Sequence, residues 1–290
     1  PLFVVHRGAA PRGAPRSSRA ARPAHARGSR EGGCVVSVGA LLLPGYVDGI
    51  DVSSVQRIDD ADAVYRAGFR FALTKVAEGA AYCDPRAAES LARLRGAGLL
   101  CGTYGFGRYS HGGARAQARR TVDGCAAVGA GTEHVVRPVL DLESCPKGTP
   151  WAALRDFAEA WIDEARKSGA LPVLYTMGSW LGPLSAASLG VPVWVAQYRS
   201  ITQAWAPALT DADSFFGARP DVAIWQYSGD KGHRVPGIAV DCDRNLFRGD
   251  EAALRTWFGL PPEGAEVDMG GPVHGSHVVD ASLGRGRSED

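Results

Sequence analysis

The sequence predicts an α/β fold in which eight strands close into a barrel. From Tyr46 onward, short apolar runs alternate with longer amphipathic stretches, which is typical of a parallel sheet covered by helices. Eight strands within about 200 residues suit a closed barrel better than an open sheet. Five strands are followed by helical stretches, whereas the last three have little helix between them. An open, doubly wound sheet is the structural alternative, but no glycine-rich phosphate loop follows any strand, so nothing supports nucleotide binding.

The strands are apolar runs of five to eight residues that end near glycine, proline or small polar residues. We expect them at Tyr46–Val52, Phe69–Val76, Leu99–Phe106, Val135–Leu142, Leu171–Thr176, Val193–Gln197, Val222–Gln226 and Ile238–Cys242. The helices have apolar residues three or four positions apart. We expect them at Asp59–Ala67, Pro85–Ala97, Ala114–Val128, Trp151–Lys167, Ser179–Ser188 and Asp250–Phe258. For the helix that begins at Trp151, Thr149 is the candidate N-cap and Gly169 the candidate residue past its end.

Both ends of the chain differ in composition from the centre. Residues 1–33 contain seven Arg and one Glu among Ala, Pro and Gly without periodicity, which predicts disorder. The apolar run Cys34–Pro44 has the length of a signal-peptide core, but it lies far from the N-terminus and is too short to span a membrane. We therefore expect a disordered leader or signal remnant over 1–45, a barrel over 46–260 and a disordered tail over 261–290. A fragment from Tyr46 to Leu260 is expected to fold alone.

Charge and cysteine content exclude several classes of function. The net charge is +1, and the region between the two tails is close to neutral, which gives no electrostatic case for nucleic acid. None of the six cysteines forms a C-x-x-C motif or has a histidine at zinc-like spacing. We expect no disulfide framework, no metal site and no cofactor.

The stretch Pro138–Ser144 has the strongest chemical signal. It reads as a buried strand that ends in Asp141 and Glu143, and residues two apart on a strand share a face, with Cα atoms roughly 6.5 Å apart. Two carboxylates this close resist ionising together, so one tends to hold a proton. Glycoside hydrolysis divides the work of two carboxylates in this way. The alternative is that these are two solvated loop carboxylates without a catalytic role.

The other predicted strands also end in residues suited to a sugar site. In a β/α barrel the active site lies at the carboxyl ends of the strands. If the eighth strand pairs with the first, Asp51 and Asp243 face Asp141 and Glu143 across the barrel mouth. Around them, aromatic faces could stack on sugars and amides could hold hydroxyls, although each aromatic taken singly could be barrel packing. The residues that end the remaining strands are Glu78, Tyr104, Phe106, Tyr175, Gln197, Tyr198, Gln226, Tyr227 and Asp241.

Eight segments together resemble the glycoside hydrolase family 25 lysozymes, the Chalaropsis-type muramidases. The resemblance covers about Tyr46 to Leu260, in the order of the family's motifs. In Gly102–Phe106, Gly105 stands where the G-x-Y-H-F pattern has His, which is expected to alter subsite contacts. The eight segments are Gly49–Gln56, Lys75–Gly79, Gly102–Phe106, Pro138–Glu143, Leu174–Thr176, Trp194–Tyr198, Trp225–Ser228 and Asp243–Gly249.

The resemblance implies a (β/α)5β3 barrel that cleaves the β-1,4 bond between N-acetylmuramic acid and N-acetylglucosamine in peptidoglycan. It implies that Glu143 is the general acid, that Asp141 lies beside the 2-acetamido group of the substrate, and that Asp51 and Asp243 support them. Asp241 is a second candidate for the last position, although the D-x-N-x-F-x-G spacing favours Asp243. The substrate-binding candidates are Glu78, Tyr104, Phe106, Tyr175, Gln197, Tyr198 and Gln226.

Two other functions fit the sequence less well. A chitinase-type D-x-x-D-x-D-x-E pattern would need Asp at positions 136 and 139, where the chain has Val136 and Val139. A barrel that binds the cell wall without cutting it would have no need of four converging carboxylates. We therefore expect a monomeric lysozyme that acts on peptidoglycan outside the cell or in the wall, either secreted or released as a phage lysin.

Overall fold

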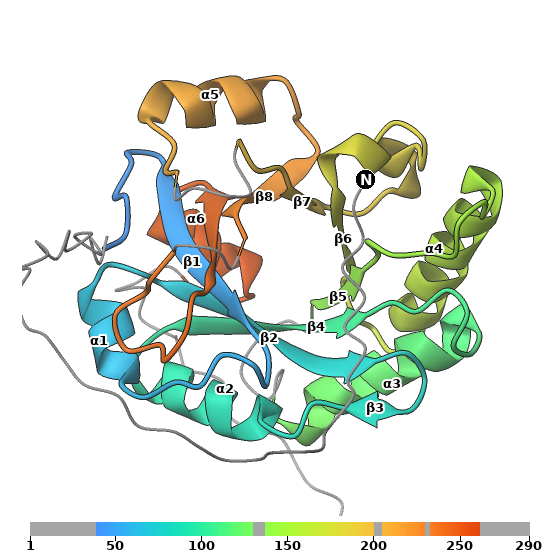
Figure 1. Ribbon diagram of the computed structural model, residues 1–290, viewed down its shortest axis with the longest axis horizontal. Helices are drawn as coiled ribbons and strands as arrows, with labels where there is room; N and C mark the ends of the chain where they lie inside the picture. Colours follow the sequence, from blue (N-terminus) through green and yellow to red (C-terminus); the bar gives the residue numbers. More distant parts are fainter. Residues whose placement is uncertain (1–38, 130–136, 200–204, 230–232, 262–290) are drawn as a thin grey trace, which may run out of the picture. The chain divides into compact units, whose positions relative to one another are not determined.

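A closed barrel forms the centre of the computed structural model, which describes residues 39–129, 137–199, 205–229 and 233–261 (Figure 1). Neighbouring strands follow the order β1-β9-β8-β7-β6-β5-β4-β2, and β1 pairs with β2 to close the ring. The strands are β1 Tyr46–Val52, β2 Phe71–Glu78, β3 Tyr82–Cys83, β4 Leu100–Phe106, β5 Pro138–Asp141, β6 Val173–Met177, β7 Val193–Ala196, β8 Val222–Ser228 and β9 Asp243–Arg248. The pairs around the ring are parallel except those of β9, which runs antiparallel to both β1 and β8.

Helices surround this ring, and the last of them packs across the end where the parallel strands begin. They are α1 Ala61–Arg66, α2 Ala87–Gly96, α3 Ala114–Ala127, α4 Trp151–Arg166, α5 Leu209–Gly217 and α6 Glu251–Trp257, with short 3-10 helices at Gly178–Trp180 and Ala186–Leu189. Asp60 caps α1 by accepting a hydrogen bond from the Ala63 N–H at 2.9 Å. Thr149 was the predicted N-cap of α4, but its hydroxyl donates to the Pro146 carbonyl and does not cap the helix. Gly169 has a φ of +77°, the left-handed conformation expected just past a helix end.

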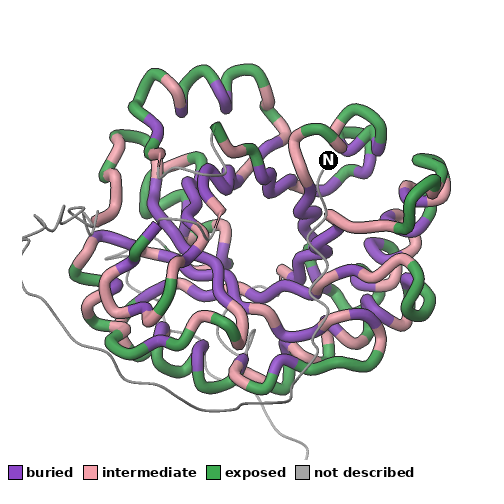
Figure 2. The backbone as a smooth tube through the Cα atoms, viewed as in Figure 1, coloured by how far each residue is buried: buried purple, intermediate pink, exposed green. Residues whose placement is uncertain are grey.

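Side chains alternate between two hydrophobic layers. Residues such as Val47, Val139 and Ile224 fill the inside of the barrel, whereas their neighbours along each strand face the helices. Leu254 of α6 and Phe258 belong to the inner cluster and pack at the end where the parallel strands begin. Figure 2 shows the result as a buried ring with exposed residues on the outer turns of the helices.

The last predicted strand, Ile238–Cys242, is wrong. In the structure Ile238 makes only an isolated bridge with Ile58, and the strand β9 begins at Asp243. The apolar residues Ile238 and Cys242 are buried as part of a loop, which imitates a strand in composition. In β9 the buried Arg244 and Asn245 hide the strand from a search for apolar runs.

Two further elements were not predicted. The region of α5 was expected to be loop, yet Ala212, Phe215 and Phe216 recur at helical spacing and are buried against β7 and β8. The short strand β3 pairs antiparallel with the end of β2. No helix in the described part of the chain is both long and apolar enough to cross a membrane.

The folded unit begins before Tyr46, the predicted start of the barrel. Within residues 39–45, the Ala40 N–H donates to the Ala67 carbonyl at 2.7 Å, and the Leu42 N–H donates to Asp48 Oδ2 at 3.1 Å. The buried Arg244 donates to the Gly39 carbonyl. Residues 39–45, assigned to the leader by sequence, are therefore attached to the barrel. Residues 1–38 and 262–290 lie outside the described residues, so the expected disorder there stays a prediction.

Removing residues 39–45 should lower the free energy of unfolding by about 1–3 kcal/mol, because their hydrogen bonds and the partly buried Leu41 and Leu43 are lost. Urea unfolding of two shortened chains, one beginning at Gly39 and one at Tyr46, measures the difference. Equal unfolding midpoints would support the boundary at Tyr46. As a control, Leu42→Ala in the full chain should change little, since Leu42 is 70% exposed.

Candidate active site

The predicted carboxylates meet at the end of the barrel where the parallel strands finish. Asp51 lies near the end of β1, Asp141 is the last residue of β5, and Glu143 follows two residues later. Because β9 runs in the opposite direction, its first residue, Asp243, reaches this same rim and pairs with Asp51. The barrel thus closes between its first and last strands, as predicted, but the closing strand is β9 and not Ile238–Cys242, and it runs antiparallel to β1.

Asp51 is fixed by two side-chain amides. Its Oδ2 atom accepts hydrogen bonds from Gln226 Nε2 at 2.8 Å and from Asn245 Nδ2 at 2.9 Å. The indole N–H of Trp194 donates to Asn245 Oδ1 at 2.8 Å and so orients that amide. Burial nevertheless raises the pKa of Asp51 to about 6, although the two amide hydrogen bonds oppose the shift. Gln226 Nε2 also lies 3.3 Å from Asp243 Oδ2 and thus links the two carboxylates.

Tyrosines join Gln226 to Glu143. The hydroxyl of Tyr175 lies 2.7 Å from Gln226 Oε1 and 3.3 Å from Glu143 Oε2, so its single proton can serve either acceptor. The Tyr198 hydroxyl also donates to Gln226 Oε1. The rings of Tyr104 and Tyr175 both pack against Trp194, with centroid distances of 6.1 and 4.4 Å. The predicted aromatics on β4 and β6 therefore form the wall beneath the carboxylates.

Asp141 and Glu143 differ in access and in partners. Asp141 is only 5% exposed, and its Oδ1 atom has no hydrogen-bond partner among the described residues. Burial raises the pKa of Asp141 well above its usual range, and the charges of Glu143 and Asp51 raise it further. Burial also raises the pKa of Glu143, whereas the Tyr175 hydroxyl and the cations Arg108 and Lys75 oppose that rise. Burial and mutual repulsion therefore favour the protonated form of at least one of these two carboxyls.

A pair of cations lies on the β2 and β4 side of the carboxylates. Glu78 accepts hydrogen bonds from Lys75 Nζ at 2.5 Å and from Arg108 Nε at 2.7 Å. Burial opposes the ionisation of Glu78, but these hydrogen bonds outweigh it and lower its pKa. Both cations also lie over the Phe106 ring, with Lys75 Nζ 5.0 Å and the Arg108 guanidinium carbon 4.5 Å from its centroid. The predicted residues Glu78 and Phe106 thus hold two cations near the site.

Gln197 does not join the cluster. Along β7 and beyond, Trp194 and Ala196 face the barrel interior, so Gln197 faces outward in register with Val195. Its Oε1 atom accepts a hydrogen bond from Arg219 Nη2 at 3.0 Å, outside the barrel wall. The predicted convergence with the carboxylates is wrong for this residue.

The structure also shows where Gly105 and Asp241 lie relative to the carboxylates. A Cβ atom at Gly105 would lie 2.1 Å from Thr121 Oγ1 of α3, so this position faces a helix and not the mouth. The absence of a side chain at Gly105 allows close packing of β4 on α3, and the expected effect on subsite contacts stays a prediction. Asp241 pairs with Arg234 at 3.0 Å in the loop before β9 and lies apart from the cluster that contains Asp243.

Three residues of the site were not singled out from the sequence. Asn245 stands two residues after Asp243 on the same face of β9, and this spacing could have identified it. Trp194 could have been found in the same way, two residues before Ala196 on the inner face of β7. Arg108 follows the end of β4 in a loop, where no strand register indicates the direction of a side chain.

Comparisons with known proteins agree with this geometry. The sequence profile of glycosyl hydrolases family 25 matches residues 50–238. The chain is 32% identical over 222 residues to lysozyme M1 from Streptomyces globisporus, which covers 72% of this chain and 70% of the relative. The solved structure of a lysozyme from Streptomyces coelicolor is 28% identical with a TM-score of 0.56, covering 72% of this chain and 94% of that one. A family GH25 lysozyme from Aspergillus fumigatus shares the fold, with a TM-score of 0.56 at 22% identity, over 73% of this chain and 98% of that one.

The barrel with carboxylates at its rim defines a glycoside hydrolase. The chain belongs to glycosyl hydrolase family 25. The resemblance drawn from eight short segments is thereby confirmed, as is the (β/α)5β3 barrel that it implied.

Asp51→Asn should make the barrel less sensitive to pH. Burial raises the pKa of Asp51 to about 6, so between about pH 4 and pH 6 the native state holds a proton that the unfolded state releases. Stability therefore falls as pH rises from about 4 to about 6, by about 3 kcal/mol for this residue. Asparagine can still accept both amide hydrogen bonds but does not titrate.

Urea unfolding at pH 4 and pH 7 tests this expectation. The wild-type protein should lose more stability between the two values than Asp51→Asn does. Asp62→Asn, on the exposed side of α1, serves as the control and should behave as the wild type. An unchanged pH dependence in Asp51→Asn would contradict the raised pKa.

Proposed function

We propose that this chain is a lysozyme that hydrolyses the β-1,4 bond between N-acetylmuramic acid and N-acetylglucosamine in peptidoglycan, with Glu143 as general acid and base. The observation that carries the proposal is the pair of neighbouring carboxyls, Asp141 and Glu143, at the carboxyl end of β5. Burial raises the pKa of both carboxyls, and a general acid needs a proton near neutral pH. The family and the lysozyme relatives support the same reaction.

Exposure distinguishes the two roles. Glu143 is half-buried beyond the end of β5, where its carboxyl can reach the oxygen of a glycosidic bond. The Tyr175 hydroxyl lies 3.3 Å from Glu143 Oε2 and can stabilise the anion once the proton has left. Asp141 lies deeper, and its unpartnered Oδ1 atom can accept the N–H of the substrate's acetamido group. We therefore assign proton transfer to Glu143 and orientation of the acetamido group to Asp141.

The reaction that these roles imply is substrate-assisted. Glu143 donates its proton to the leaving oxygen while the acetamido carbonyl oxygen attacks the anomeric carbon and forms an oxazolinium ion. The proton lies on Glu143 at the start of this step, which leaves Asp141 as the anion that holds the acetamido N–H and balances the positive charge. Glu143, now an anion, removes a proton from water as the water opens the oxazolinium ring. Two displacements at one carbon give net retention of configuration.

The remaining predicted residues act around this pair. Asp51 and Asp243, held by Gln226, would position Asp141, water or sugar hydroxyls. Tyr104 and Tyr175 are buried, so their rings would shape the floor beneath the sugar and would not stack on it. We infer that the enzyme acts where peptidoglycan lies, at the cell wall, by secretion or release from a phage. Its monomeric state stays a prediction.

Glu143→Gln should reduce turnover by about 10²–10⁴-fold, because glutamine has no proton to transfer. The rate of clearing of a peptidoglycan suspension measures the change. Circular dichroism should show an intact fold. The control is Glu159→Gln on the exposed face of α4, which should keep wild-type activity. Near-normal turnover by folded Glu143→Gln would rule out Glu143 as the acid.

The substrate-assisted route predicts that the β-anomer of the new reducing end is released first. Proton NMR of a short glycan during the first turnovers follows the anomer before mutarotation. An α-anomer formed first would mean inversion. Incubation with a 2-fluoro glycoside supplies the second test, since a stable glycosyl ester on Asp141 would identify a protein nucleophile and overturn the route.

A further inference from the structure

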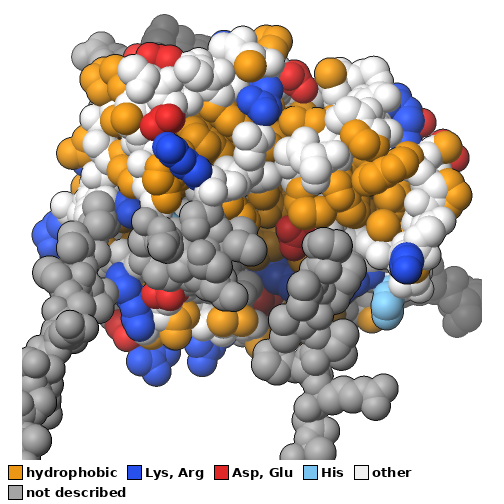
Figure 3. All heavy atoms as spheres, turned by 45° about the horizontal axis from the view of Figure 1, so that its top comes forward, with side chains coloured by type: hydrophobic (Ala, Val, Ile, Leu, Met, Phe, Trp, Pro, Cys, Tyr) orange, Lys and Arg blue, Asp and Glu red, His pale blue; other side chains and the backbone are white. Residues whose placement is uncertain are grey.

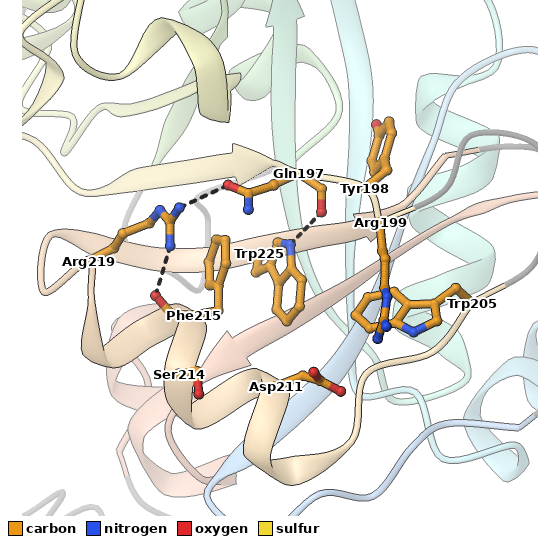
Figure 4. Close-up of a pocket in the computed structure, with 9 residues that line it drawn as sticks. All are labelled: Gln197, Tyr198, Arg199, Trp205, Asp211, Ser214, Phe215, Arg219 and Trp225. Carbon is orange, nitrogen blue, oxygen red and sulfur yellow. Dashed lines mark hydrogen bonds between the residues drawn. The ribbon is translucent and has the colours of Figure 1, made fainter.

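A second cavity lies outside the barrel wall, between α5 and the ends of β7 and β8 (Figure 4). Its volume is about 500 Å³. Two arginines, Arg199 and Arg219, lie on different sides of it, with aromatic rings between them (Figure 4). Figure 3 turns the α5 side of Figure 1 toward the viewer and shows basic side chains among hydrophobic ones on this face. None of the reaction steps proposed above uses this cavity.

The aromatic rings of this cavity are already covered. Trp225 stacks on Phe215 with a centroid distance of 4.2 Å and an interplanar angle of 10°. The Arg219 guanidinium carbon lies 4.5 Å from the Phe215 centroid, and that of Arg199 lies 5.5 Å from the Trp205 centroid. A pyranose ring needs an open aromatic face for stacking, and here the faces are occupied by rings and guanidinium groups. The cavity is therefore poorly suited to a further sugar and presents cations instead.

The charges of the cavity are unbalanced. Arg219 donates to two neutral acceptors, Gln197 Oε1 at 3.0 Å and the Phe215 carbonyl at 3.3 Å. Within the described residues, neither Arg199 nor Arg219 forms a salt bridge. The carboxylate of Asp211 lines the cavity too, but it accepts the Ala208 N–H at 2.9 Å. Two guanidinium groups fixed by aromatic and neutral partners suit a carboxylate ligand.

One side chain, Tyr198, touches both the cavity and the active-site cluster. Tyr198 lines the cavity, and its hydroxyl donates to Gln226, the same amide that holds Asp51. A peptide attached to a sugar at the carboxylates would pass Tyr198 on its way to the arginines. In peptidoglycan, the muramic acid carries a short peptide with free carboxylates. Four or five extended residues span up to about 13–18 Å.

We propose that this cavity binds the carboxylates of the stem peptide, the short peptide attached to muramic acid. The proposal rests on the lysozyme function proposed above. Arg199 and Arg219 then give the enzyme a preference for glycan strands that carry acidic stem peptides. The preference acts through binding of the substrate and leaves the chemical step at Glu143 unchanged.

The test compares three soluble glycan substrates: strands with stem peptides, the same strands after enzymatic removal of the peptides, and strands whose peptide carboxylates have been converted to amides. For the wild type, kcat/KM should be roughly tenfold higher on the acidic strands than on the other two. The double variant Arg199→Gln, Arg219→Gln should lose this advantage and cut all three at similar rates. Arg93→Gln, on α2, is the matched control and should keep the preference.

Each contrary result has a distinct meaning. Equal wild-type rates on all three substrates would overturn the proposal. Equal losses of activity by the double variant on every substrate would also overturn it, because they would indicate that the arginines have a structural role. The preference for acidic strands could also be suppressed by polyglycerol phosphate but not by free stem peptide. That result would assign the cavity to wall phosphates and overturn the proposal.

Calorimetry with free stem peptide separates this proposal from the lysozyme function. Binding by the wild type and by Glu143→Gln, but not by the double variant, supports the cavity even if no strand is cut. In that case the lysozyme function fails and the peptide site stands. If the enzyme cuts the strands but neither binds the free peptide nor prefers acidic strands, the lysozyme function stands and the peptide site fails.

Discussion

The pairing of β9 with both β1 and β8 is the constraint on which the rest of the structure depends. It closes the barrel, and its antiparallel direction brings the start of β9 to the rim where the parallel strands end. Three successive residues then act on different sides of the sheet. Asp243 and Asn245 face the carboxylates, whereas Arg244 faces outward, lies over Phe69 and binds the Gly39 carbonyl. The same strand thus organises the site and anchors the segment before β1.

The carboxylates are held close together at a cost in stability that the surrounding polar groups partly offset. Burial raises the pKa values of Asp51, Asp141 and Glu143, which means that each resists ionisation in the folded chain. Amide donors on Asp51 and the cations near Glu143 reduce this penalty without removing it. Active sites commonly retain such strain, because the perturbed carboxyl is the one that can transfer a proton.

Much of the fold and most of the site could be predicted from the sequence, because a buried parallel strand is an uninterrupted apolar run. Where that signal failed, a physical reason is visible. Strand β9 contains Arg244 and Asn245, whose partners come from distant segments that no local pattern reveals. Gln197 and Gly105 lie near strand ends but face outward, because successive residues of a strand point to opposite sides of the sheet. Arg108 lies on a loop, and the direction of its side chain depends on Glu78 from another strand.

Helix α6 packs Leu254 under the inner cluster together with Phe258, at the end of the barrel opposite the carboxylates. The barrel therefore has one accessible end. Under the proposed function, a glycan strand would not thread through the barrel but would reach Glu143 by lying across the rim, with both of its ends outside. Such an enzyme has no structural need to find a chain terminus. It can cut in the interior of a cross-linked network, where each scission releases tension in the mesh long before soluble fragments accumulate.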